Sequence, residues 1–429
     1  MLDKIKRFPL IRALYRVPGL VSLYHFLWAV CAALFYGFPG KIIFVIGVTG
    51  TKGKTTTLEL LNAILEAAGK KTALMSSLRV KMGEQSKKSN FGNTMPGRFY
   101  IQRFLSDAVR AGCKYALVEV TSQGAVLYRH RFINWNAGVL TNLSPEHIES
   151  HGSFKNYRRA KLGFLNYVGV RGGRIFINSE DENSGFFLEK LAKFNPIVFS
   201  RETEESERVF PKFNPARLAV ATEPPKFLPS DFNRDNVAAA AAVAHSLGIP
   251  EKIIEEALLN FRGVQGRAEF LQRRPFSVVV DYAHTPDSLR KIYEALRVEA
   301  VKGSRFICVL GAAGGGRDKW KRPEMGRVAA EFCDEIFLTD EDPYDENPGQ
   351  ILSEIKSGIP DGKSLVTREI PDRREAIKAA VGLAGNGDTI IATGKGSEDW
   401  IHVANGRKIP WNERAILEEV LNENKNGRT

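Results

Sequence analysis

The sequence is poor in cysteine and has no long block of lysine and arginine. Its four cysteines, Cys31, Cys113, Cys308 and Cys333, form no Cys-x-x-Cys pair, which argues against a structural zinc site. The last three lie in or beside apolar runs, so we predict core thiols in a reducing compartment. The net charge of +12 comes from 61 basic residues scattered among 49 acidic ones. Because no basic face with interleaved aromatic residues stands out, no nucleic-acid partner is expected.

A clear membrane span is missing too, although the N-terminus comes close to one. An apolar, aromatic stretch at residues 20–38 follows five basic residues: Lys4, Lys6, Arg7, Arg12 and Arg16. No small-residue cleavage site supports a signal peptide. Two interpretations stay open: a helix packed on its own domain or on a partner, including a second copy, and a helix seated on a membrane surface. We expect a cytoplasmic protein, peripheral at the inner membrane face in the second case.

The alternation of apolar strands with helical segments predicts an α/β protein of two or three domains. We divide it into an N-terminal helical segment (residues 1–40), a central P-loop ATPase domain with a mostly parallel sheet (41–262) and a C-terminal Rossmann-like α/β domain (263–429). A helix is predicted at residues 236–247 and a disordered tail at 422–429. The predicted strands are residues 42–46, 115–120, 137–140, 174–177, 277–280, 306–311, 335–339 and 389–393.

A glycine-rich loop that ends in Gly-Lys-Thr follows the first apolar run, and a helical pattern follows the loop. Strand, loop and helix in this order are the context of a phosphate-binding P-loop. Backbone N–H groups and the helix N-terminus would face the anion, Lys54 would reach the outer phosphates, and Thr55 would place its hydroxyl on Mg²⁺. Val48 stands where the commonest form has a glycine. The loop predicts binding of a nucleoside triphosphate.

A second strand ends in a carboxylate, Glu119, followed by Ser122. Ligands of open α/β sheets collect at the carboxyl edge, so Glu119 is placed to hold the same Mg²⁺ ion. A third segment, residues 141–161, carries His147 and ends at Lys161.

These three segments resemble the Mur ligase family, most closely its MurE-type members, which build the cell-wall peptide. The resemblance implies that Thr55, Glu119, His147 and Lys161 hold Mg²⁺, with Lys161 carbamylated because a plain ammonium would repel the ion. It implies ATP binding by the P-loop residues Thr49, Gly50, Thr51, Lys52, Gly53, Lys54, Thr55 and Thr56.

The resemblance continues to the C-terminus. It implies nucleotide contacts from Asn236, from Arg267 in a hinge-like segment, from Asp281 and His284 in an Asp-Tyr-Ala-His-Thr-Pro segment, and from Arg317 in a glycine-rich loop. The family's substrate loop corresponds to Asn93 and Thr94, and Ser122 is a further residue implied to bind the substrate. The segment that selects the amino acid corresponds to Glu341, Asp342 and Tyr344, with Gly394 and Glu398 in a later loop.

Two departures from the family pattern bear on the substrates. Only the first 46 residues precede the P-loop, where MurE-like enzymes have a domain that grips uridine diphosphate, so the acceptor is UDP-linked, lipid-linked or a free peptide. Tyr344 replaces the arginine that diaminopimelate-adding enzymes carry, and Glu341 and Asp342 favour a basic amino acid. An acidic turn that only meets solvent is the alternative for this pair.

A P-loop, a metal site and a second α/β domain suit γ-phosphoryl transfer from ATP to a carboxylate, followed by amine attack on the acyl phosphate. Mg²⁺, Lys54, Lys161 and Arg267 would carry the catalysis by positioning and charge neutralisation. The predicted substrates are therefore a peptide or UDP-muramoyl-peptide acceptor and a free amino acid. The alternatives are a Mur-like ligase with another acceptor and a P-loop switch.

Overall fold

A computed structural model describes residues 18–89, 95–146, 148–201, 230–317, 319–360 and 365–427. The described chain divides into two compact units. The first holds the residues up to 201 and residues 234–261, and the second holds residues 230–233 and everything from 262 onward. Asn93, Thr94, His147 and the segment 202–229 lie outside the described residues.

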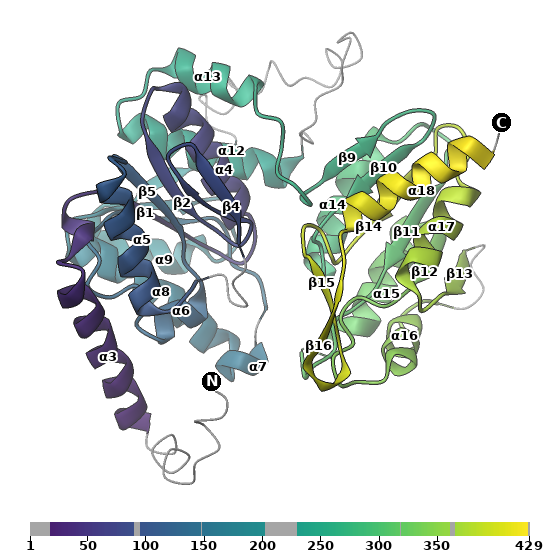
Figure 1. Ribbon diagram of the computed structural model, residues 1–429, viewed down its shortest axis with the longest axis horizontal. Helices are drawn as coiled ribbons and strands as arrows, with labels where there is room; N and C mark the ends of the chain where they lie inside the picture. Colours follow the sequence, from purple (N-terminus) through teal and green to yellow (C-terminus); the bar gives the residue numbers. More distant parts are fainter. Residues whose placement is uncertain are drawn as a thin grey trace. The chain divides into compact units, whose positions relative to one another are not determined.

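The first unit is built on an eight-stranded, mostly parallel sheet with the order β4-β3-β2-β5-β1-β6-β7-β8 (Figure 1). Strand β3 pairs antiparallel with both β2 and β4, and the other pairings are parallel. The central strand β1 is almost wholly buried and pairs with β5 and β6, which explains its continuous apolar sequence. The strands are β1 (Phe44–Thr49), β2 (Thr72–Met75), β3 (Arg79–Met82), β4 (Gln85–Lys88), β5 (Tyr115–Glu119), β6 (Trp135–Leu140), β7 (Arg174–Asn178) and β8 (Ile197–Phe199).

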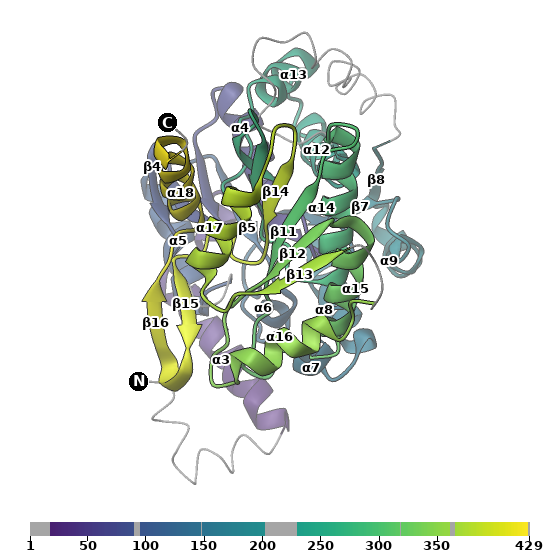
Figure 2. The same ribbon diagram turned by 90° about the vertical axis from the view of Figure 1, so that its right-hand side faces the viewer.

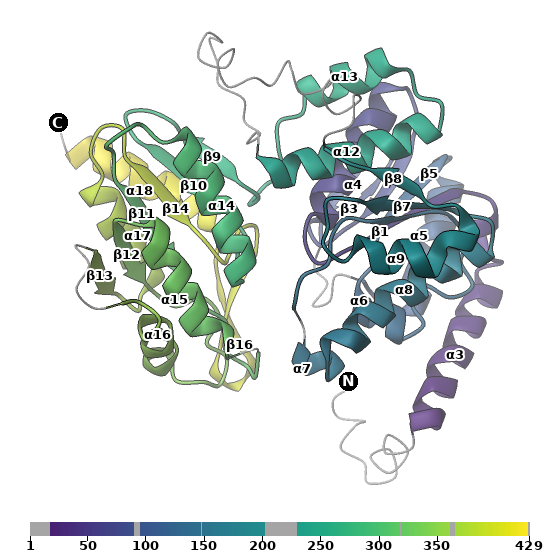
Figure 3. The ribbon, with the colours of Figure 1, turned by 180° about the vertical axis from the view of Figure 1, so that it is seen from behind.

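Helices cover both faces of this sheet. Helices α4 (Lys54–Ala67), α12 (Asp231–Ser246) and α13 (Glu251–Leu259) lie on one side (Figure 1). On the other side, the apolar core lies beneath α5 (Arg98–Arg110), α6 (Ser122–Val126), α8 (Phe154–Val170) and α9 (Ser184–Leu191) (Figure 3). The short α7 (Ile148–His151) precedes α8, and α3 (Pro18–Phe35) packs against α5. Within the described residues, no helix is both long and apolar enough to cross a membrane.

The second unit has a six-stranded sheet with the order β13-β12-β11-β14-β10-β9, in which only β9 runs antiparallel (Figure 2). One apolar core lies under α14 (Pro286–Glu299), α15 (Lys321–Phe332) and α16 (Pro348–Lys356), and another under α17 (Arg373–Leu383) and α18 (Glu413–Gly427). The strands are β9 (Glu269–Gln272), β10 (Ser277–Val280), β11 (Phe306–Leu310), β12 (Glu335–Leu338), β13 (Val366–Glu369), β14 (Thr389–Ala392) and the hairpin β15 (Trp400–Val403) with β16 (Arg407–Pro410).

The predicted α/β fold class, with a mostly parallel P-loop sheet and a second α/β sheet, is confirmed. Two local predictions are wrong. The tail predicted to be disordered from residue 422 continues helix α18 to Gly427, because Val420 and Leu421 pack in the core beside α17. Cys308 and Cys333 are not free thiols: β11 and the end of α15 bring their Cα atoms to 6.1 Å, and a disulfide joins them. Cys31 and Cys113 are free.

Candidate active site

The P-loop joins the buried strand β1 to helix α4, as its sequence predicts. Gly53 caps α4 with φ of 81°, a left-handed conformation that favours glycine. A Cβ atom on Gly53 would lie 2.2 Å from the side-chain oxygen of Asn236, so the loop has room only for glycine here. Asn236 accepts a hydrogen bond from Thr57 Oγ1 at 3.2 Å, which fixes α12 against the start of α4.

Lys54, Thr55 and Glu119 form the polar centre of the loop. Thr55 Oγ1 donates to Glu119 Oε2 at 3.0 Å, and Lys54 Nζ lies 3.9 Å from Glu119 Oε1. The Lys54 ammonium also donates to the carbonyls of Gly50 (3.1 Å) and Thr51 (2.9 Å). A hydroxyl and a carboxylate side by side are hard oxygen donors of the kind that Mg²⁺ takes. Thr49 and Thr56, the remaining predicted threonines, are buried beside this centre.

Lys161 reaches this centre from helix α8. Its side chain is 1% exposed, and its Nζ donates to the Gly50 carbonyl at 2.7 Å. Burial, and then the neighbouring Lys54 ammonium, hold the pKa of the Lys161 amine well below its usual range. Tyr157, one turn earlier on α8, lies with its ring 4.6 Å below Nζ and its hydroxyl 3.0 Å from Thr51 Oγ1. The amine held against the P-loop is therefore one whose ammonium form is disfavoured by burial.

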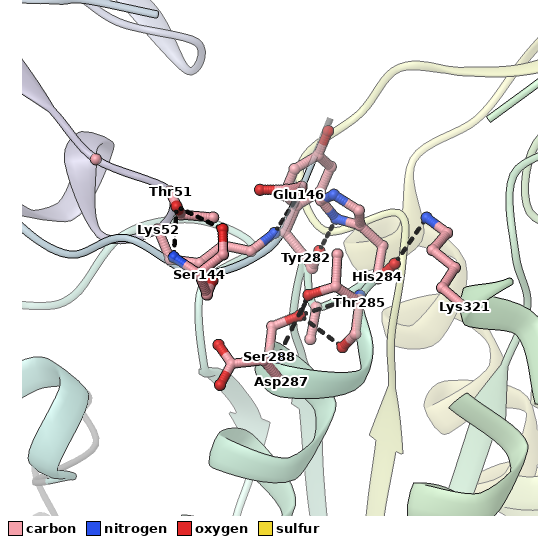
Figure 4. Close-up of polar contacts among 12 residues, drawn as sticks. Thr51, Lys52, Ser144, Glu146, Tyr282, His284, Thr285, Asp287, Ser288 and Lys321 are labelled. Atoms are coloured by element: carbon pink, nitrogen blue, oxygen red, sulfur yellow. Dashed lines mark hydrogen bonds and ion pairs between the residues drawn. The ribbon is translucent and has the colours of Figure 1, made fainter. Parts of the chain in front are cut away.

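The segment after β6 holds the P-loop from the other side. Asn142 accepts from the Lys52 N–H at 2.8 Å, and the Ser144 N–H donates to Thr51 Oγ1 at 3.0 Å. Lys52 and Glu146 form an ion pair at 2.9 Å, which Figure 4 shows together with the Thr51–Ser144 contacts. Lys52, predicted to bind ATP, is thus already paired with a carboxylate. Across the described chain, no group of three His, Cys, Asp or Glu side chains forms a ready metal site.

Ser122 belongs to a set of polar groups that the sequence alone did not connect. Its Oγ lies 3.0 Å from His151 Nε2, and the His151 ring lies 5.3 Å from that of Tyr157. Burial, and then Lys161, lower the pKa of His151 below its usual value, so the neutral imidazole is favoured. Only the shared carboxyl edge of β5 and β6 could have suggested this contact.

A basic cluster in the first unit was also missed. Arg129 donates to the Met95 carbonyl, and its Nε is buried without a hydrogen-bond partner. Burial lowers the pKa of Arg129, and no carboxylate among the described residues pairs with it. Arg98 and Arg129 both depress the pKa of His25, although burial is the larger cause. Half-buried cations of this kind suit an anionic ligand.

In the second unit, Arg267, Asp281 and His284 lie around Tyr282 at the carboxyl end of β10. The Arg267 guanidinium stacks on the Tyr282 ring at 4.1 Å. Asp281 accepts the Ala268 and Ala283 N–H groups, both at 2.6 Å, so its carboxylate also fixes the backbone. His284 Nδ1 lies 2.7 Å from the Tyr282 carbonyl, and Lys321 donates to the His284 carbonyl at 3.0 Å (Figure 4).

The predicted selecting segment is held by Lys395, whose importance sequence analysis missed. Lys395 is fully buried and bridges Asp342 (3.0 Å) and Glu398 (2.7 Å). Asp342 also accepts the His402 N–H at 2.7 Å, and Glu398 accepts from the Tyr282 hydroxyl at 3.0 Å. Asp342 follows β12, Lys395 follows β14, and Glu398 precedes β15. The Lys395 ammonium therefore links the loops at the ends of these three strands.

Glu341 differs from Asp342. It is 5% exposed, and its Oε2 has no hydrogen-bond partner. Burial raises the pKa of Glu341, while the Lys321 ammonium opposes the shift. A Cβ atom on Gly394 would lie 2.5 Å from this Oε2, so Gly394 leaves room for the carboxylate. The two acids look equivalent in the sequence, but Asp342 is paired with Lys395 and Glu341 keeps an unused oxygen.

Tyr344 and Arg317 form the rim of this acidic region. The Tyr344 ring stacks on His402 at 4.9 Å, and Arg317 donates to the Tyr344 hydroxyl at 3.1 Å. Asp345 accepts the Asn405 N–H at 2.7 Å, and Glu346 pairs with Arg322 at 3.0 Å, so these two acids stabilise the loop.

Two family descriptions match the chain: "Mur ligase middle domain" over residues 48–244 and "Mur ligase, glutamate ligase domain" over residues 266–396. A UDP-N-acetylmuramoyl-L-alanyl-D-glutamate–2,6-diaminopimelate ligase of Gloeobacter violaceus is 36% identical over 423 residues, covering 95% of this chain and 82% of the relative. The chain belongs to the Mur ligase family. A UDP-N-acetylmuramyl-tripeptide synthetase of Roseiflexus is 34% identical over 91% of this chain and 81% of the relative.

Solved structures agree on the fold of this Mur ligase. MurF from Acinetobacter baumannii superposes with a TM-score of 0.62 at 18% identity, over 85% of this chain and 77% of that one. FolC from E. coli superposes with a TM-score of 0.61 at 17% identity, over 93% of both chains. The chain is an ATP-dependent, ADP-forming amide-bond ligase, as the resemblance predicted. The alternative of a P-loop switch is not favoured.

Proposed function

We propose that this ligase transfers the γ-phosphoryl group of ATP to an acceptor carboxylate and that an amino acid then displaces the phosphate to form an amide. The observation that carries this proposal is the convergence of Lys54, Thr55, Glu119 and Lys161 on the P-loop. Lys54 would neutralise charge on the transferring group, and Arg267 would act similarly from the second domain. We also propose the domain limits 1–40, 41–262 and 263–429.

The oxygen donors fit a Mg²⁺ ion, which would supply positive charge to offset that of the ATP phosphates. Thr55 and Glu119 would hold it with His147 and Lys161. Lys161 fits the carbamate form because burial disfavours its ammonium form, and the free amine can add CO₂ and release a proton, giving oxygen ligands in place of a cation. Thr49, the other P-loop residues Gly50 to Thr56, Asn236, Asp281, His284 and Arg317 would bind the nucleotide.

We propose that the acceptor is a UDP-muramoyl peptide, as the names of the relatives indicate, and that the step belongs to peptidoglycan synthesis. Ser122, with Asn93 and Thr94, would position its peptide. The uncompensated guanidinium of Arg129, which donates to the Met95 carbonyl, supports binding of an anionic group of the acceptor.

For the second substrate we propose a basic amino acid. The unused oxygen of Glu341 supports an ammonium contact there, whereas Asp342 is committed to Lys395. Tyr344 would pack along the side chain, and Glu398, with Gly394, would hold the α-ammonium group. The Gloeobacter relative is named for diaminopimelate, which carries a second carboxylate. This chain has Tyr344 instead of an arginine that could pair with that carboxylate.

We propose that the enzyme works in the cytoplasm and associates at its N-terminal region, residues 20–38, with the inner membrane surface or with a second copy. The exposed apolar side chains of α3 support an association of this kind.

The test of the ligase proposal is ADP release with UDP-muramoyl-dipeptide and a panel of lysine, ornithine, diaminopimelate, glutamate and alanine. ADP should form only when acceptor and amine are both present, and the product should carry the added residue by mass spectrometry. The Glu119→Gln variant should lose this activity. ADP formation that is independent of any amine would contradict the proposal.

A further inference from the structure

Helix α3 points its large apolar side chains away from the domain on which it packs. Its small residues Ala29, Ala32 and Ala33 are buried, in a helix that lies against α5. Residues three and four apart share one face of a helix. The opposite face carries four leucine side chains that are 44–62% exposed: Leu20, Leu23, Leu27 and Leu34. Trp28 and Phe35 lie at the edge of this face and are also exposed, at 44% and 75%.

This outer face is apolar over the whole helix. The sequence of α3 contains no Asp, Glu, Lys or Arg, and its 18 residues give a stripe roughly 27 Å long at about 1.5 Å per residue. Soluble proteins rarely leave a continuous apolar stripe of this kind in water. The inner side is already fixed by specific contacts, including Ser22 Oγ with Tyr128 OH at 2.8 Å and Phe26 against Phe132. Trp28 and Phe35 add ring contacts to Phe99 of α5 at 5.6 and 6.2 Å. The four outward leucines are therefore the side chains with no evident role in attaching α3 to the domain.

We infer that this face of α3 rests on an anionic lipid surface, with the helix lying in the plane of the interface. The inference rests on the proposed peripheral association of residues 20–38 and names lipid, rather than a second copy, as the partner. Tyr24 and Trp28 on the outer face are the aromatic types that favour the headgroup level. Residues 1–17, which lead into α3, contain five basic residues and one acid, Asp3, a net charge of +4 (5 − 1). Apolar face and basic flank together are the pattern of an interfacial helix.

Charge decides between lipid and a second copy as the occupant. Two copies meeting through α3 would bring two segments of charge +4 together, and their repulsion would oppose the contact. Anionic headgroups would instead neutralise the same charges while the stripe enters the acyl boundary. An anionic lipid surface therefore accounts for both the apolar face of α3 and the positive charge of residues 1–17.

The chain offers a direct probe of this face. Cys31 is exposed on α3, Cys113 is buried, and the other two cysteines are joined in a disulfide, so a polarity-sensitive thiol label attaches at Cys31. We expect its emission to shift to the blue with phosphatidylglycerol vesicles and not with phosphatidylcholine vesicles, and the shift to weaken with salt. The unlabelled full-length chain should float with the phosphatidylglycerol vesicles.

The matched variants are Leu27→Glu on this face and Val298→Glu, which places the same charge at an apolar position of the second unit that is 84% exposed. Leu27→Glu should weaken vesicle binding about tenfold or more, whereas Val298→Glu should not. Ligase activity without vesicles should be unchanged in both, which separates this inference from the proposed reaction.

Three results would overturn it. The first is no vesicle binding by the full chain. The second is equal binding by Leu27→Glu and wild type. The third is a wild-type dimer, measured by sedimentation without lipid, that Leu27→Glu dissociates, because the stripe would then be a contact between copies. If Leu27→Glu fails to fold, Leu23→Ser, at an outward position that is also 51% exposed, takes its place in the same flotation assay with the same expected loss.

Discussion

At the scale of single residues, the site depends on side chains whose charges are set by burial. Lys161 is a buried amine beside another ammonium, Lys54, an arrangement that disfavours its cationic form. Lys395 is equally buried, but it is surrounded by carboxylates that raise its pKa and keep it charged. The same residue type is therefore suited to a carbamate in one unit and to an ion-pair bridge in the other.

The first prediction concerns Lys161. Lys161→Ala should lose synthesis by about a hundredfold or more, because the metal would lose an oxygen ligand, and small carboxylates such as acetate at high concentration should restore part of it. The measurement is product formation with and without added carboxylate. Lys155→Ala, an exposed lysine earlier on α8, is the control and should behave as wild type. Wild-type turnover by the Lys161 variant would refute the carbamate.

The second prediction concerns the choice of amino acid. Glu341→Gln should reduce the preference for lysine over diaminopimelate about tenfold or more, since a partly desolvated carboxylate–ammonium contact is worth roughly 1.5–3 kcal/mol. Asp342→Asn should also lower activity, but mainly by releasing Lys395. Asp345→Asn, at the exposed rim, is the control. An unchanged ratio of kcat/KM values in Glu341→Gln and Asp342→Asn would remove both acids from the selecting role.

At the scale of elements, helix α8 positions Lys161 and packs closely against strand β1. A Cβ atom on Gly47 of β1 would lie 2.6 Å from Phe164 of α8 and 2.8 Å from Trp135 of β6. The helix can approach the strand closely only over glycine, and this approach brings Lys161 to the Gly50 carbonyl.

The third prediction follows from this contact. Gly47→Ala should lower the free energy of unfolding by roughly 1–3 kcal/mol through overpacking, and it should impair activity by moving α8. Gly163→Ala, on the open side of α8 where nothing lies within 4 Å of the added Cβ, should stabilise by about 0.5–1 kcal/mol. Thermal unfolding of both variants measures the difference. A Gly47→Ala protein as stable as wild type would mean that α8 can shift freely.

At the scale of the whole molecule, stability in acid should depend on a buried histidine outside the site. His130 is 3% exposed, both its ring nitrogens lack a hydrogen-bond partner, and burial lowers its pKa to about 3. Because this value is below the unfolded one, near 6.5, the unfolded chain binds the proton first. His130 therefore contributes full stability above pH 6.5, and that contribution is lost as the pH falls toward 3.

The fourth prediction is that the first unit loses about 2 kcal/mol of stability between pH 7 and pH 5 through His130. His130→Phe should flatten this part of the pH profile in denaturant titrations. The control is His245→Phe, at a partly exposed position of α12, which should leave the slope unchanged. An equal slope in wild type and His130→Phe would show that other groups cause the acid sensitivity.

The sequence by itself determined the fold class and the phosphate-binding loop, because both rest on local signals. Apolar runs specify buried parallel strands, and glycine at position 53 is required by the backbone of the loop itself. The sequence also indicated Glu119, from its place at the end of a predicted strand, and Lys161, from its spacing and by resemblance.

Tertiary structure decided what these residues touch. The pairing of Lys395 with Asp342 and Glu398, the unused oxygen of Glu341 and the contact of Ser122 with His151 join residues far apart in sequence. The outward direction of the large side chains of α3 likewise depends on which face α5 covers. Periodicity shows that a helix has an apolar face, but α3 is apolar on every side, so only packing could select the side that is buried.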